Sequence, residues 1–155
     1  MQKDTVIIGI GNTLMGDDGA GPKVILLLEG RFEEVELVSL HTPSHSILTY
    51  LTGKKKAIIV DVAFFGAQPG EVKAFKPNQI KRASEKSGLH LHDIDIIKVL
   101  ENAGTLQLLP AEVTIYCIQA ESVKPSVVLS PAVKLGVQEA ARLIEKEIQA
   151  GTNEG

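Results

Sequence analysis

Three short segments of the chain are apolar at both odd and even positions, and they constrain the fold more than any other feature. Segments of four to six residues that are rich in β-branched side chains are typical of strands buried on both faces. Such strands occur mainly in parallel sheets that helices cover on both sides. The three segments are residues 6–10, 57–60 and 113–118.

Two further strands and several helices are predicted around these segments. Residues 35–40 are a strand candidate, and residues 71–75 alternate polar with apolar side chains, as a half-exposed edge strand does. Proline in a first turn, acidic residues near a helix start and glycine after a helix end are the helix signals. They predict helices that begin near Pro22, Ser46, Asp93 and Pro131, with ends near Gly30, Gly53, Gly104 and residue 150.

The order of these elements predicts one α/β domain. Strands that alternate with helices form a mostly parallel, twisted sheet with helices on both faces. We expect about five strands in a single domain over residues 1–150, and a disordered tail over residues 151–155.

Charge and cysteine content limit the partners and the compartment. The 16 basic and 19 acidic residues give a net charge of −3, without the basic excess of a nucleic-acid-binding protein. The apolar stretches are far shorter than a membrane span, and no signal-peptide cleavage site follows the first of them. Cys117 is the only cysteine, which excludes an internal disulfide. We therefore expect a cytoplasmic protein that neither enters membranes nor binds nucleic acid.

A glycine-rich loop follows the first strand, where a Rossmann fold binds phosphate. The dinucleotide fingerprint fails because Leu14 replaces its third glycine, and the loop has no Walker lysine. Asp17 and Asp18 would repel a pyrophosphate, so the loop favours a cation over an anion. An equally weighted alternative is that both aspartates only cap the turn and the following helix.

Asp61 and a histidine pair are the other candidates. Asp61 follows the second buried segment, at the sheet edge where α/β proteins bind ligands, although it could equally cap the next loop. His90 and His92 precede a predicted helix, and imidazole is a frequent nickel, zinc or copper ligand. A solvated loop is the alternative for them, and His41 with His45 forms a weaker rival pair.

These candidates converge on one edge of the predicted sheet. Two carboxylates and one imidazole leave coordination positions open, as in a site that recognises a metal held by another molecule.

Four blocks of the chain resemble the hydrogenase maturation endopeptidases. GIGNTLMGDDGAGP resembles the family signature around its first metal-binding acid, and IIVDVAFFGAQPGEV resembles the block in which an aspartate closes a buried strand. HDIDIIKVL resembles the block that begins with the metal-binding histidine, and ESVKPSVVLSPAV resembles the motif before the C-terminal helix. The blocks occur in the family's order and span nearly the whole chain.

The resemblance implies a function and a set of residues. It places the metal ligands at Asp18, Asp61 and His92, and Asp18 and Asp61 are also the expected catalytic residues, as ligand or base. Such enzymes remove the C-terminal extension of a [NiFe] hydrogenase large-subunit precursor after nickel insertion, with the nickel supplied by the precursor. The form of the Gly16–Gly19 segment most resembles the hydrogenase 3 or formate-hydrogenlyase branch. The loop from Leu40 to His45 lacks the family's usual glycine turn, so it assigns no particular hydrogenase.

Two alternatives to this protease stay open at the level of sequence. One is a nucleotide-binding α/β module that uses the glycine loop, and the other is a non-catalytic nickel-binding maturation chaperone with the same ligands. A cysteine protease is disfavoured because Cys117 lies inside a predicted buried strand.

Overall fold

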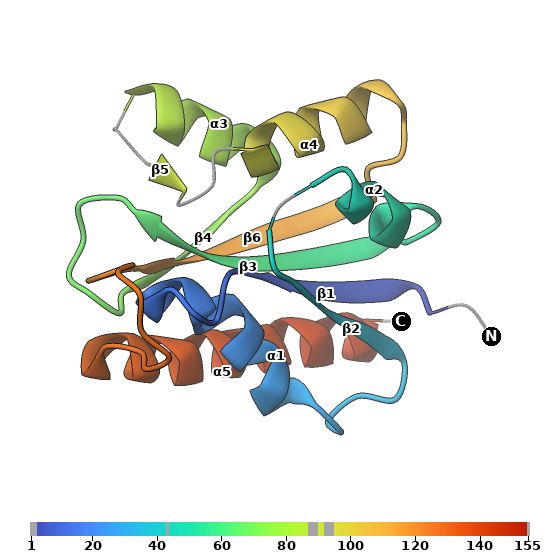
Figure 1. The fold of residues 1–155 in the computed structure, drawn as a ribbon. Helices are drawn as coiled ribbons and strands as arrows, with labels where there is room; N and C mark the ends of the chain where they lie inside the picture. The colour runs from blue at the N-terminus through green and yellow to red at the C-terminus, as the bar shows by residue number, and fades with distance from the viewer. Residues whose placement is uncertain (1–2, 43, 87–89, 92–94, 155) are drawn as a thin grey trace.

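A central sheet lies between two layers of helices (Figure 1). The computed structural model describes residues 3–42, 44–86, 90–91 and 95–154. Five strands follow the order β2-β1-β3-β6-β4, and the short β5 pairs with β3. Their bounds are β1 Thr5–Ile10, β2 Val35–Leu40, β3 Lys56–Phe64, β4 Val72–Phe75, β5 His90–Leu91 and β6 Glu112–Gln119. The predicted α/β sheet of about five strands is confirmed.

The sheet is mostly parallel, as predicted. β1 pairs in parallel with β2 and β3, and β3 pairs in parallel with β6. β4 and β5 are antiparallel to their partners, and β4 is the edge strand that the alternating pattern predicted. The carboxyl ends of β1, β3 and β6 therefore meet at one edge, which lies on the left in Figure 1.

Each face of the sheet is covered by its own helices (Figure 1). α1 (Ala20–Leu28) and α5 (Pro131–Glu154) cover one face, while α2 (Ser46–Leu51), α3 (Pro77–Lys86) and α4 (Asp95–Thr105) cover the other. Ile58 and Val60 of β3 pack toward α1 and α5, and Ala57 and Ile59 pack toward the other layer. A strand between two helix layers needs apolar side chains at every position, which explains its unbroken apolar pattern.

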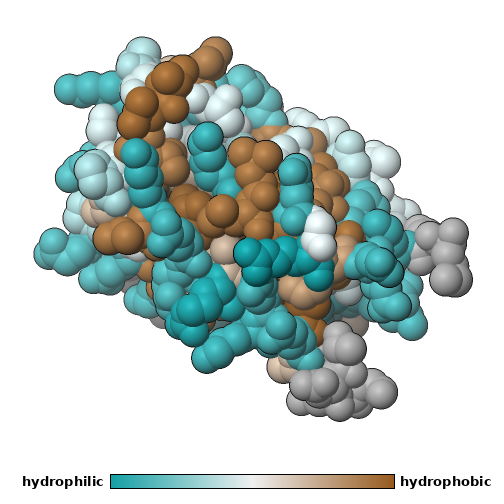
Figure 2. All heavy atoms as spheres, turned by 90° about the horizontal axis from the view of Figure 1, so that it is seen from below, coloured by the Kyte–Doolittle hydropathy of each residue, from teal (hydrophilic) through white to brown (hydrophobic). Residues whose placement is uncertain are grey.

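The outer face of the α1–α5 layer is mixed in character. Figure 2 shows hydrophobic side chains intermixed with hydrophilic ones on this face. Leu26 and Leu27 of α1 and Leu135 of α5 are among the exposed hydrophobic residues. None of the helices in the described part of the chain is long and apolar enough to span a bilayer.

Three helical features differ from the sequence predictions. α3 was not predicted, and α4 continues past Gly104 to Thr105. α5 extends over residues 151–154, where we expected a disordered tail, while residue 155 lies outside the described part. Extending an existing helix adds a hydrogen bond for each residue fixed, so a glycine near its end does not by itself stop it.

Candidate functional site

Asp18 lies at the carboxyl end of β1, in a 3₁₀ turn, η1 (Gly16–Gly19), that leads into α1. Its side chain is almost fully buried, with 2% of its surface exposed. The Oδ2 atom accepts a hydrogen bond of 2.8 Å from the amide of Asn12. The carboxylate is therefore held against the loop through which the chain leaves β1.

Gly11 explains why this loop can close so tightly over η1. Its φ is +151°, and a Cβ atom at this position would lie 1.7 Å from the carbonyl oxygen of Asp18. Any side chain would displace the Asp18 backbone, so glycine is required at position 11 for close approach.

The amides of the glycine loop are already bound within the protein. A phosphate-binding loop directs free N–H groups at its ligand. Here seven consecutive or near-consecutive amides donate to oxygen atoms of the chain itself, namely those of Gly11, Asn12, Leu14, Met15, Gly16, Asp17 and Asp18. This arrangement opposes the nucleotide-binding alternative.

Asp17 and Asp18 are adjacent but face different parts of the molecule. Asp17 is fully buried, and its carboxylate accepts hydrogen bonds from Glu121, Ser122 and Ser130 in the segment between β6 and α5. Asp17 therefore has a structural set of contacts, but it binds this distant segment rather than capping its own turn or the helix that follows. The carboxylate of Asp18 faces the loop at the strand ends instead.

Asp61 lies in β3, three residues before the carboxyl end of that strand. Its side chain is 2% exposed, and its Oδ1 atom accepts a 2.8 Å hydrogen bond from the amide of Val62. The last β1–β3 pair is Gly9 with Val60, so Asp61 begins the part of β3 that extends beyond β1. Because η1 also contacts β3, the two buried acids share one edge of the sheet.

β5 brings the histidine segment to the same edge. His90 pairs with Phe64 and Leu91 pairs with Ala63 at the carboxyl end of β3. His92, the predicted ligand, follows directly and lies outside the described residues. Within the described residues, no three His, Cys, Asp or Glu side chains are grouped closely enough to hold a metal ion. The rival residues His41 and His45 are both exposed.

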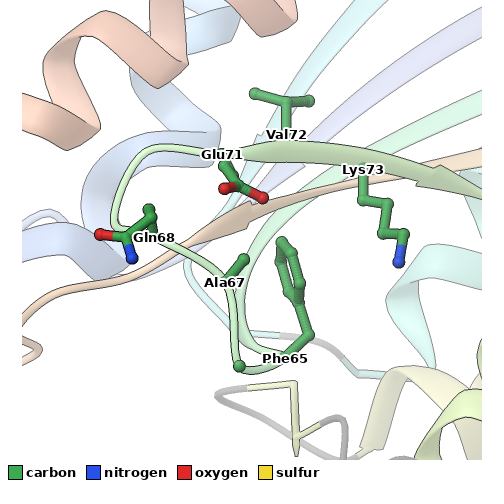
Figure 3. A pocket seen from close by; sticks show the side chains of 7 residues that line it. Phe65, Ala67, Gln68, Glu71, Val72 and Lys73 are labelled. Atoms are coloured by element: carbon green, nitrogen blue, oxygen red, sulfur yellow. The ribbon is translucent and has the colours of Figure 1, made fainter.

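A shallow groove of about 480 Å³ lies beside the end of β3 (Figure 3). The loop between β3 and β4 contributes Phe65, Ala67, Gln68 and Glu71, and β4 contributes Lys73. Asp18 and Asp61 are not part of its lining.

Gln119 supports this groove and was not predicted from sequence. Its Oε1 atom accepts hydrogen bonds from the amides of Phe65 (2.9 Å) and Ala67 (3.2 Å). Its Nε2 atom donates to the carbonyl oxygen of Ala120 at 3.1 Å. A polar residue at the end of an otherwise apolar strand was the available signal.

Comparison with known proteins identifies the family. Residues 22–147 match the family model HycI, described as hydrogenase maturation protease. The chain is 30% identical over 156 residues to the coenzyme F420 hydrogenase subunit delta of Methanothermobacter thermautotrophicus, covering 94% of each chain.

Two solved structures have the same fold. The [NiFe] hydrogenase maturation protease HybD from Thermococcus kodakarensis is 26% identical, with a TM-score of 0.79 over 92% of this chain and 97% of that one. The hydrogenase maturating endopeptidase HybD from E. coli matches in fold, at 19% identity and a TM-score of 0.83 over 95% of this chain and 93% of that one. The chain described here belongs to the hydrogenase maturation protease family.

Proposed function

We propose that this protein is a nickel-dependent endopeptidase that removes the C-terminal extension of a [NiFe] hydrogenase large-subunit precursor after nickel insertion. The observation that supports it is the pair of buried carboxylates, Asp18 and Asp61, at one edge of the sheet. Burying carboxylates is costly unless hydrogen bonds or a cation stabilise their charge. A shared edge with two such groups is therefore suited to a divalent cation.

The nickel belongs to the substrate in this proposal. Asp18, Asp61 and His92 offer two carboxylates and an imidazole, and nickel accepts both types of ligand. This set leaves coordination positions that the ligands of the precursor itself would fill. The enzyme would then bind a precursor firmly only when its metal centre is loaded.

The chemistry is metal-assisted hydrolysis of an amide bond. Nickel in the precursor lies near the scissile segment, where it can polarise the carbonyl group or activate the attacking water. Asp18 and Asp61 serve as nickel ligand and as general base for that water. The proton then passes to the leaving nitrogen, and the precursor separates from its C-terminal extension.

The test is a gel of nickel-loaded precursor mixed with the full chain. The wild-type protein should shorten the large subunit, whereas Asp18→Asn, Asp61→Asn and His92→Ala should slow cleavage strongly. Asp4→Asn is the matched control, because Asp4 is exposed, precedes β1 at the opposite edge and pairs with Lys55. Normal cleavage by all three site variants would show that the site assignment is wrong.

The same gel separates the protease from the chaperone alternative, which predicts a stable complex with an unshortened subunit. Equilibrium dialysis with nucleotides tests the remaining alternative. Tight nucleotide binding that persists in Asp18→Ala would favour it. We expect no such binding, because the amides of the glycine loop already donate to oxygen atoms of the protein.

The proposal also covers the setting of the reaction. We place it in the cytoplasm, with the precursor as partner and without nucleic acid or membrane insertion. The Gly16–Gly19 sequence resembles the hydrogenase 3 or formate-hydrogenlyase branch of the family, without assigning a particular hydrogenase as the source of the precursor.

A further inference from the structure

Asp17 has a set of contacts that the proposed reaction does not use. Its Oδ2 atom accepts hydrogen bonds of 2.9 Å from the amides of Glu121 and Ser122 and from the hydroxyl of Ser130. Its Oδ1 atom accepts a 2.7 Å bond from the amide of Ser130. All four donors are uncharged, and the side chain is fully buried. Four donors therefore stabilise one buried negative charge.

The charge also lies at the start of α5. Lys134 donates its amide to the carbonyl oxygen of Ser130, so Ser130 is the residue that caps this helix. The amino end of a helix carries a partial positive charge, which favours a carboxylate there. Asp17 thus joins the start of α5 to η1, across more than a hundred residues of sequence.

Backbone hydrogen bonds reinforce the same connection. The amide of Gly16 donates to Ser126 (2.8 Å), and that of Asp17 donates to Ser122 (2.9 Å). In return, Ser126 donates to Leu14 at 3.0 Å. The turn that carries the two acids is therefore bound to the 121–130 segment from both its backbone and the Asp17 side chain.

We propose that Asp17 is a positioning residue for Asp18, and this inference rests on the function proposed above. Successive residues of a 3₁₀ turn project about 120° apart. With Asp17 bound toward the 121–130 segment, Asp18 projects toward Asn12 and the strand ends. Asp17 touches neither substrate nor metal in this arrangement, and it acts by fixing the direction of its neighbour.

The positioning needs a carboxylate rather than an amide. An asparagine has one acceptor oxygen, and its NH₂ group donates. In Asp17→Asn that NH₂ group would face either the Ser130 amide or the three donors on Oδ2, so at least one buried donor loses its acceptor. The turn can then rotate, and Asp18 leaves the direction in which Asn12 holds it.

The experiment measures kcat and KM of the full-length Asp17→Asn variant on nickel-loaded precursor, together with hydrogen exchange at the Asn12 amide by NMR. We expect kcat to fall about 10- to 100-fold, as for a misplaced catalytic group, and KM to rise, because a displaced Asp18 also binds the nickel of the precursor less well. The Asn12 amide should exchange faster, because its acceptor is Asp18 Oδ2.

Tyr116→Phe is the control for lost stability. It removes a hydrogen bond to Glu147 on the same helix, α5, far along it from Ser130. This variant should keep both kcat and the slow exchange of Asn12. Ser130→Ala is the substitute if Asp17→Asn does not fold, because it removes only the hydroxyl donor to Asp17. It should lower kcat and speed the exchange of the Asn12 amide in the same way, but by a smaller amount.

The outcomes separate this inference from the proposed function. Unchanged kcat, or unchanged exchange at Asn12, would overturn the positioning role while leaving the protease intact. If the wild-type protein cleaves no precursor, the proposed function fails. The exchange rate of the Asn12 amide in Asp17→Asn, compared with the wild type, then decides whether Asp17 holds Asp18 in place.

Discussion

Asp61 and Cys117 are direct partners across the parallel pair of β3 and β6. Paired residues on neighbouring strands project from the same face of the sheet, so the thiol lies beside the carboxylate. Cys117 is fully buried, and its burial raises the pKa of the thiol. The negative charge of Asp61 raises this pKa further. A nucleophilic cysteine needs the thiolate, so this position disfavours the chemistry of a cysteine protease.

The Cys117 thiol should be protected in the native state. We expect a disulfide reagent such as Ellman's reagent at about pH 8 to label the folded protein very slowly. The same reagent should label one thiol per chain in concentrated guanidinium chloride, because Cys117 is the only cysteine. Labelling of the native protein at the unfolded rate would contradict the burial of this residue.

Tyr116→Phe should make the protein less sensitive to alkali. Burial raises the pKa of Tyr116 above its ordinary value near 10, and the bond of 2.6 Å to Glu147 adds to the effect. Above about pH 10 the unfolded chain loses the phenolic proton while the folded chain keeps it. The free energy of unfolding of the wild type should therefore fall as the pH rises through this range, and the variant should lack this component.

Denaturant titrations of the two proteins between about pH 8 and pH 11 measure the effect. Cys117 contributes a fall in the same direction in both proteins, so the Tyr116 component is the difference between their curves. At neutral pH the variant should be less stable by about 1–2 kcal/mol because Glu147 loses a donor. Parallel curves would show that Tyr116 does not ionise differently in the two states.

The sheet could be predicted from local patterns because a central strand has apolar side chains on both of its faces where helices cover both faces of the sheet. Residues 57–60 are apolar throughout since two helix layers cover β3, and no long-range information is needed to recognise this. α3 was missed because it packs little apolar surface into the core, and Ile80 is its one fully buried large side chain among the described residues. Its proline at the first position, Pro77, was the usable signal.

The division of roles between Asp17 and Asp18 could not be predicted from the motif. The donors that bind Asp17 lie 104 to 113 residues away, at Glu121 and Ser130. Local sequence offers the same turn preferences for both aspartates. The shared edge of Asp18 and Asp61, in contrast, follows from parallel strand order alone, because parallel strands end at the same side of a sheet.

Gly21→Ala should destabilise the protein through the contact between α1 and the sheet. A Cβ atom on Gly21 would lie 2.5 Å from the carbonyl oxygen of Ile10 and 2.8 Å from that of Val60. Because backbone atoms of β1 and β3 cannot move aside cheaply, the helix must shift, at a cost of about 1–3 kcal/mol.

Gly104→Ala is the matched control for this substitution. Gly104 lies in α4, and a Cβ atom there meets nothing within 4 Å. Alanine should stabilise the helix by up to about 1 kcal/mol. Thermal unfolding followed by circular dichroism measures both variants, and equal midpoints would refute the close approach of α1 to the sheet.

Gln119→Leu should release the loop that forms one wall of the groove. The side chain of Gln119 holds the amides of Phe65 and Ala67, and leucine offers neither of them an acceptor. Because the loop is only half buried, water can partly replace the lost bonds, and we expect a loss of about 1–2 kcal/mol. Hydrogen exchange by NMR should show both amides exchanging faster than in the wild type.

Gln119→Glu retains an acceptor oxygen for the two amides, so it should preserve their slow exchange while losing the bond to Ala120. Slow exchange of both amides in Gln119→Leu would mean that the neighbouring turn, rather than Gln119, holds the loop beside β3.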